Sequence, residues 1–289
     1  MNAGPESAVH LGLVARSVSA QPNRVDGTSD ATSNRLPAQT PHMDNLLLVG
    51  VAATFFAAGA TKGIAGMGLP TVSMGLLGLF MPPASAAALL VLPSLLTNVL
   101  QCLGRHFRGI AAILWPMWLG IFAGVLLTPL PSLASGAATV RVGLGVVLVA
   151  YAAYGLLRPS MTLQLERRTL LLAALVVGYA TGAMTAATGV FIAPMVMFLQ
   201  MLALEKERMV QAMGLSFTVG TVALGVSLGW GTSWHALFSQ EGALALACAF
   251  AGMGLGVRMR ERISASTFRT TLFVVFGVLG VALIAKELL

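Results

Sequence analysis

The stretch from Gly59 to Gly78 reads Gly-Ala-Thr-Lys-Gly-Ile-Ala-Gly-Met-Gly-Leu-Pro-Thr-Val-Ser-Met-Gly-Leu-Leu-Gly. It interrupts an apolar run with glycines, one lysine and one proline, none of which a plain membrane helix requires. A weaker copy, from Thr181 to Pro194, reads Thr-Gly-Ala-Met-Thr-Ala-Ala-Thr-Gly-Val-Phe-Ile-Ala-Pro. Hydrophobic segments broken by Gly and Pro at corresponding places in two halves of a chain point to the binding site of a transporter. We therefore expect the function to centre on these two breaks.

The composition is that of an integral membrane protein. Hydrophobic residues make up 57% of the 289 residues, charged residues make up 9%, and the mean hydropathy is +0.86. This is far too apolar for a soluble domain of this length. The apolar runs are continuous and do not alternate, so we expect helices, and not barrel strands, to cross the lipid bilayer. The net charge of +7 comes with arginines in short patches at the ends of apolar runs, which indicates membrane topology and no nucleic-acid partner.

Ten apolar segments are predicted, at about 44–61, 69–81, 84–104, 110–129, 138–157, 169–187, 191–203, 208–229, 241–257 and 268–286. The second and the seventh are short. At about 1.5 Å per residue each covers roughly 20 Å, less than the ~30 Å hydrocarbon core. We expect partial or tilted helices there, joined to their predecessors through the glycine breaks.

The predicted organisation has four parts. Residues 1–43 are rich in Ser, Thr, Asn, Pro and Ala and lack a long apolar run, so they are expected to form a disordered tail. Residues 44–157 form a first transmembrane repeat, residues 158–168 a cytoplasmic linker, and residues 169–289 a second transmembrane repeat. Each repeat contains five of the apolar segments.

The basic residues predict the orientation of the two repeats. If all ten segments cross the membrane, one side receives Arg105, Arg108, Arg158, Arg167, Arg168, Lys206, Arg208, Arg258, Arg260, Arg262 and Arg269. The other side receives only Arg141, Lys286 and the arginines of the tail. Because basic loops stay in the cytoplasm, the first side is predicted to be cytoplasmic and both termini to lie outside. The predicted fold class is thus an all-α polytopic membrane protein with two inverted repeats, each led by a Gly/Pro-broken helix pair.

The first break is predicted to contribute an anion site. Gly66, Gly68 and Pro70 lead into the second apolar segment, which places Pro70 and Thr71 in a first helical turn with unpaired amides. Such a helix start attracts anions through its free N–H groups and through the helix dipole.

The second break is expected to supply the same arrangement through Thr188, Gly189 and Pro194. Two helix starts that converge near the membrane centre would form a cradle for an anion. The alternative is that the glycines only allow close packing of helices.

Polar side chains inside the spans are further candidates for substrate binding. The third segment carries Asn98 and Gln101, and the eighth carries Gln211 and Ser216. Such side chains tend to face the interior of a helix bundle, where they bind substrate or tie helices together.

Lys62 is the only charged residue between Asp44 and Arg105. In one interpretation it ends the first span and its long side chain reaches the membrane surface. In the other, its ammonium turns into a cavity beside the second segment and supplies a full positive charge for an anion.

The sequence offers little for an enzyme. Cys102 and Cys248 lack a CxxC pattern or histidine neighbours, and no Walker sequence, zinc-binding HExxH or nucleophile elbow occurs. We therefore expect no catalytic residue, no metal site and no cofactor.

Three stretches of the chain resemble the sulfite exporter TauE/SafE family. They are Lys62-Gly-Ile-Ala-Gly-Met-Gly-Leu-Pro-Thr-Val-Ser-Met-Gly-Leu-Leu, Thr188-Gly-Val-Phe-Ile-Ala-Pro and Val210-Gln-Ala-Met-Gly-Leu-Ser-Phe-Thr-Val. The resemblance covers about residues 43–289, and the second break departs from it in having Gly189 in place of a glycine cluster. It implies a bacterial inner-membrane transporter of sulfite, sulfonates or related small anions.

The leading hypothesis is a secondary transporter that moves a small anion across the bacterial plasma membrane by exposing a site alternately to its two sides. An anion channel of the same fold is the first alternative. A membrane-embedded enzyme and a purely structural membrane protein are the others. The sequence leaves the anion, the direction of transport, the coupling ion and the oligomeric state open.

Overall fold

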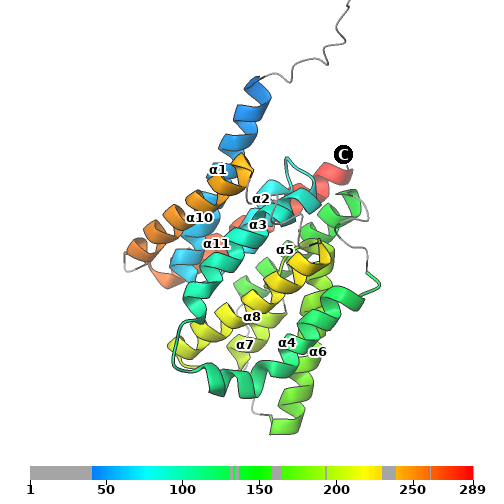
Figure 1. Cartoon of the computed structure of the whole chain (residues 1–289), viewed down its shortest axis with the longest axis vertical. Helices are drawn as coiled ribbons and strands as arrows, with labels where there is room; N and C mark the ends of the chain where they lie inside the picture. The colour runs from blue at the N-terminus through cyan, green and yellow to red at the C-terminus, as the bar shows by residue number, and fades with distance from the viewer. Residues whose placement is uncertain are drawn as a thin grey trace, which may run out of the picture. The chain divides into compact units, whose positions relative to one another are not determined.

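The secondary structure of the described residues consists of helices. The computed structural model describes residues 41–130, 133, 137–157, 165–192, 194–229, 239–260 and 262–288. The helices are α1 (Pro41–Ala65), α2 (Leu69–Leu77), α3 (Pro83–Cys102), α4 (Phe107–Leu127), α5 (Ala137–Leu157), α6 (Arg167–Thr188), α7 (Met195–Met201), α8 (Lys206–Ser227), α10 (Gln240–Met259) and α11 (Ala265–Leu288) (Figure 1). Residues 1–40 of the predicted tail and the greater part of the predicted linker lie outside the described residues, and residues 41–43, predicted as tail, belong to α1.

Eight of these helices are long and apolar enough to cross a membrane. They are α1, α3, α4, α5, α6, α8, α10 and α11. The expectation of a polytopic all-helical membrane protein is therefore confirmed. The two remaining helices, α2 and α7, have 9 and 7 residues and correspond to the two segments that the sequence predicts to be short.

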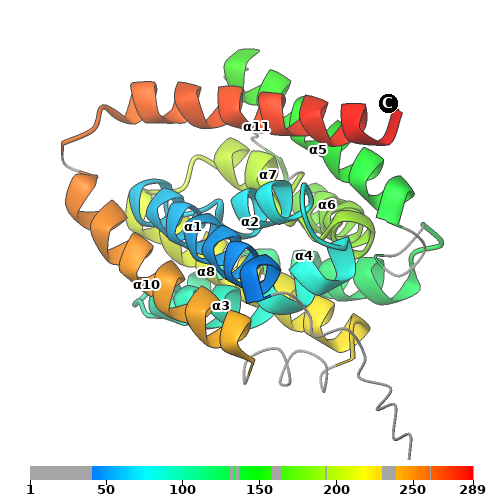
Figure 2. The ribbon, with the colours of Figure 1, turned by 90° about the horizontal axis from the view of Figure 1, so that it is seen from above.

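Four pairs of helices account for the main packing: α1 with α10, α4 with α6, α5 with α11, and α3 with α8. The first pair and the second pair lie on opposite sides of the bundle, and the short helices α2 and α7 lie between them (Figure 2). Helices that are distant in sequence thus enclose the two segments that follow the breaks.

Glycines set the closeness of two of these pairs. A Cβ atom added at Gly252 of α10 would lie 2.1 Å from the carbonyl oxygen of Phe56 on α1, and one added at Gly59 would lie 2.2 Å from that of Ala249. In the second pair, a Cβ at Gly178 of α6 would lie 2.1 Å from the carbonyl oxygen of Met117 on α4. Only glycine allows backbones to approach this closely, as in small-residue helix interfaces in membranes.

The centre of the bundle brings the two breaks into contact. Eight residues of α2 are buried. A Cβ at Gly189 would lie 2.8 Å from Cε of Met74, so the second break lies directly against α2.

Candidate functional site

The first break is a sharp change of chain direction between α1 and α2. Gly66 has φ of 76° and Gly68 has φ of 105°, both in the left-handed region that favours glycine. Gly68 is the N-cap of α2, and Pro70 lies in its first turn. Gln101 of α3 fixes the turn, because its Nε2 donates a 2.6 Å hydrogen bond to the carbonyl oxygen of Gly66.

Lys62 lies one turn before this break and is buried, with 3% of its surface exposed. Its Nζ donates a 3.0 Å hydrogen bond to Oγ1 of Thr97 and a second hydrogen bond to Oδ1 of Asn98, both on α3. Among the described residues no carboxylate forms an ion pair with it. Since an ammonium has three N–H groups, one donor remains for a further acceptor. The side chain therefore does not reach the membrane surface as an interface anchor would.

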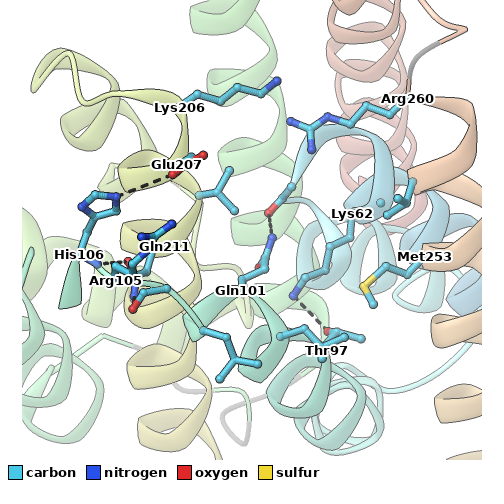
Figure 3. A pocket seen from close by; sticks show the side chains of 17 residues that line it. Lys62, Thr97, Gln101, Arg105, His106, Lys206, Glu207, Gln211, Met253 and Arg260 are labelled. Carbon is cyan, nitrogen blue, oxygen red and sulfur yellow. Dashed lines mark hydrogen bonds and ion pairs between the residues drawn. The ribbon is translucent and has the colours of Figure 1, made fainter.

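A cavity of about 630 Å³ leads to Lys62. Its walls come from the end of α1, the end of α3 and the loop after it, the start of α8 and the end of α10 (Figure 3). The predicted site residues that line it are Lys62, Gly66, Gln101 and Gln211. Asn98 lies buried beneath them, against the Lys62 ammonium.

The charge of the cavity wall is strongly positive. Besides Lys62, the wall contains Arg105, Lys206 and Arg260, and Glu207 is its one acidic residue. The carboxylate of Glu207 lies 3.8 Å from Nε2 of His106. The surroundings of the cavity therefore favour an anion over a cation.

Gln211 and Ser216 make structural contacts. Nε2 of Gln211 donates to the carbonyl oxygens of Cys102 and Gly104 at 2.9 and 3.0 Å, and its Oε1 accepts from the His106 backbone N–H at 3.1 Å. The amide of Gln211 thus holds the loop between α3 and α4 against α8. Oγ of Ser216 accepts a 3.0 Å hydrogen bond from Nε1 of Trp118, and this residue does not line the cavity.

The second break does not reach this cavity. Thr188, Gly189 and Pro194 are not among its lining residues. The Thr188 hydroxyl donates a 2.7 Å hydrogen bond back to the carbonyl oxygen of Met184, and Gly189 contacts Met74. Pro194 is the N-cap of α7, which has only 7 residues and so presents a weak helix dipole.

Several buried polar atoms near the first break have no hydrogen-bond partner among the described residues. They are Oγ1 of Thr71, Oγ of Ser73, Nδ2 of Asn98 and Oε1 of Gln101. Buried polar atoms are nearly always paired. The unpaired amide atoms of Asn98, which bonds Lys62, and of Gln101, which lines the cavity, therefore indicate a place for a ligand or water. Thr71 and Pro70 lie on α2, away from the cavity wall.

The opposite end of α2 is held by charged side chains. Nε of Arg141 donates a 3.0 Å hydrogen bond to the carbonyl oxygen of Gly78, and its Nη1 donates a 2.6 Å hydrogen bond to Oε1 of Glu287. Lys286 donates to the carbonyl oxygen of Leu79. Because α4 begins beside the cavity and runs away from it before α5 begins, these contacts lie at the end of the bundle opposite to the cavity mouth. We call them the far-side clamp.

The sequence did not single out several wall residues as site residues. Thr97 accepts a hydrogen bond from Lys62 and also donates a 2.7 Å hydrogen bond to the carbonyl oxygen of Pro93 in its own helix. A threonine in a span usually makes only the second kind of bond, so the sequence gives no reason to select it. The cations Arg105, Lys206 and Arg260 lie in loops or at helix ends far apart in the sequence, where they are typical of membrane topology. Only the fold brings them together.

The comparison with protein families decides the identity of the chain. A family model described as Sulfite exporter TauE/SafE matches residues 51–283. The chain belongs to the TauE/SafE family. Searches of the curated proteins and of the solved structures gave no match.

Membership of the TauE/SafE family confirms the resemblance that the sequence indicates, and the matched range includes both breaks and the cavity wall. The protein is therefore a multi-pass membrane protein of a transporter family with a small anion as the implied substrate.

Among the described residues no three His, Cys, Asp or Glu side chains lie close enough to hold a metal ion.

Proposed function

We propose that the protein is a secondary transporter of sulfite, a sulfonate or a related small sulfur-containing anion in the bacterial plasma membrane. The observation that carries this proposal is the buried Lys62 ammonium at the inner end of a basic cavity. A buried charge in a membrane span is costly and usually marks a substrate or ion pathway.

Lys62 and Asn98 together offer two donors for one anion. The ammonium has one N–H beyond those bonded to Thr97 and Asn98, and Nδ2 of Asn98 has no partner among the described residues. A tetrahedral or pyramidal oxyanion presents several acceptor oxygens and could accept from both. Hydrogen bonds in which the donor or the acceptor is ionised are roughly twice as strong as neutral ones.

An inverted repeat fits the helix packing. Suppose that α1 to α5 of the first repeat correspond in order to α6, α7, α8, α10 and α11 of the second. Exchanging the repeats then turns the contact of α1 with α10 into the contact of α6 with α4. The contacts α3–α8 and α5–α11 are unchanged by this exchange. A shared motif opens the last helix of each half: Ala137-Ala-Thr-Val-Arg141 in α5 and Ala265-Ser-Thr-Phe-Arg269 in α11. This supports two repeats related by a two-fold axis, and opposite orientation of such repeats is the arrangement of many secondary transporters.

Alternating access fits the two ends of the molecule. The cavity opens on the side that carries Arg105, Lys206 and Arg260, and the far-side clamp closes the other end of α2. In the opposite state we expect the clamp to open and the unpaired hydroxyls of Thr71 and Ser73 to reach the substrate pathway. An anion channel of the same fold would need both ends open at once.

Anion binding to the purified protein tests this proposal. The experiment measures the unfolding temperature with sulfite, thiosulfate, a sulfonate, sulfate and a carboxylate at equal ionic strength, because a ligand that binds only the folded state stabilises it. We expect one of the sulfur-containing anions to raise the unfolding temperature of the wild type and not of Lys62→Met. Equal shifts in both proteins would overturn the proposed site.

A further inference from the structure

A second hollow lies beside the cavity, and we call it the lateral groove. It has a volume of about 640 Å³ and is lined mostly by apolar side chains, among them Ile64, Met67, Phe268 and Leu272. These residues come from the end of α1, the loop after it, and the start of α11. The groove also includes Lys206 and Arg260, which belong to the cavity wall as well.

The lateral groove lies at the level where three spans reach the membrane surface. The spans of α1 and α10 end at Ala65 and Met259, and that of α11 begins at Ser266. A hollow at this depth runs from the edge of the hydrocarbon core into the headgroup region. At this depth an apolar wall suits lipid chains, and two cations suit the headgroup level.

Lys206 and Arg260 form the polar end of the groove. Figure 3 shows their side chains extending towards one another across the opening, from α8 and from the end of α10. Neither of them forms an ion pair among the described residues. The neighbouring Glu207 turns instead towards His106. Two unpaired cations that face each other repel, and an anion between them would offset that repulsion.

We infer that the lateral groove binds one anionic phospholipid. Its phosphate lies between Lys206 and Arg260, and the first part of an acyl chain lies along Phe268 and Leu272. The combination of a basic end and an apolar wall matches an amphiphile, whereas a small soluble anion would make no use of the wall. Basic pockets between spans on the cytoplasmic side are suited to anionic headgroups. This inference does not depend on which anion the protein transports.

The position of this lipid links it to the cavity. Because Lys206 and Arg260 line both hollows, a lipid phosphate there would lower the positive charge at the cavity mouth. The membrane composition would then adjust how readily a small anion enters.

Native mass spectrometry of the purified protein tests this inference. The protein is mixed with phosphatidylglycerol or with phosphatidylcholine of the same acyl chains, and the bound lipids per chain are counted. We expect one phosphatidylglycerol to bind in preference to phosphatidylcholine. The double variant Lys206→Gln/Arg260→Gln should bind phosphatidylglycerol at least roughly tenfold more weakly than the wild type does. Arg258→Gln is the matched control, because it removes a positive charge from the same helix end without lining the groove.

A charge-preserving variant keeps the test independent of folding. Lys206→Arg/Arg260→Lys should bind phosphatidylglycerol as the wild type does. Equal binding of the two lipids to the wild type, or undiminished binding to the glutamine variant, would overturn the inference. So would a crosslinked second copy of the chain seated in the groove. None of these results depends on transport activity, so they are separate from the test of the proposed function.

Discussion

Nζ of Lys62 donates a 3.0 Å hydrogen bond to Oγ1 of Thr97, which joins the end of α1 to α3 across the inner end of the cavity. The Thr97 hydroxyl in turn donates to the carbonyl oxygen of Pro93 at 2.7 Å. Thr97 therefore fixes the position of the ammonium, while the charge itself remains without a counterion among the described residues.

Removal of this charge should weaken anion binding. Lys62→Met keeps the aliphatic stem and removes the ammonium. We expect the dissociation constant of the anion to rise about 10- to 100-fold, because this factor corresponds to the loss of one hydrogen bond to a charged group. Lys62→Arg keeps the charge with a different shape and reach, and should retain part of the affinity. Calorimetric titration measures both, with Arg258→Met as the control for general loss of positive charge.

The turn at the first break should tolerate side chains poorly. At Gly68 a Cβ would lie 2.9 Å from Cγ2 of Thr61, and φ is 105°. At Gly66 the nearest atom would be 3.7 Å away, so only the positive φ opposes a side chain. We expect Gly66→Ala to cost roughly 1–2 kcal/mol of stability and Gly68→Ala to cost more.

Thermal unfolding in detergent measures this order, and flux in proteoliposomes measures its effect on transport. Gly109→Ala is the control, because nothing lies within 4 Å of a Cβ there. A Gly68→Ala protein with wild-type stability and flux would contradict the assignment of a strained turn.

Much of the fold follows from the sequence, since long apolar runs in a membrane protein can only be helices. Two short segments were also predicted, at about 69–81 and 191–203, and the helices found there are shorter still, with 9 residues in α2 and 7 in α7. The pairing of the helices was not, because Gly252 and Gly178 act through contacts with Phe56 and Met117 that are far away in the sequence.

The site was predicted in part. Four of the candidate residues, Lys62, Gly66, Gln101 and Gln211, line the cavity, and their binding of an anion stays a prediction. The sequence could not choose between a lysine that reaches the surface and one that turns inwards. The predicted residue Gly189 lies against Met74 and away from the cavity. Sequence similarity between the breaks could not reveal that only the first of them lines this cavity.

The interface between α1 and α10 should depend on Gly252. Its Cβ would lie 2.1 Å from the Phe56 carbonyl oxygen, so Gly252→Ala should separate the helices and cost about 1–3 kcal/mol. Gly254→Ala, two residues further along α10, meets nothing within 4 Å and should be neutral or slightly stabilising. Unfolding temperatures of the two variants compare them, and equal destabilisation would argue against the close approach.

The far-side clamp should hold the cavity-open state. Arg141 and Glu287 have only 16% and 15% of their side chains exposed, so Glu287→Gln leaves a largely buried guanidinium without its carboxylate. We expect this variant to populate the opposite state more, and a cysteine placed at Ser73 to react faster with a thiol reagent added from the clamp side. An unchanged labelling rate would show that the clamp does not gate that side.

The basic loops should lie in the cytoplasm. A cysteine at Arg258, introduced after replacement of Cys102 and Cys248 by serine, should resist a membrane-impermeant thiol reagent added to intact spheroplasts. It should react after the membrane is permeabilised. Strong labelling of intact spheroplasts would reverse the proposed orientation.

The ratio of internal to external ³⁵S-labelled sulfite in proteoliposomes, under an imposed ion gradient, tests the transport mechanism most directly. For a secondary transporter with its site at Lys62, the wild type should accumulate sulfite above the ratio set by the anion's own electrochemical gradient, and Lys62→Met should not. A wild-type ratio that never exceeds that value, with rapid flux, would instead identify a channel.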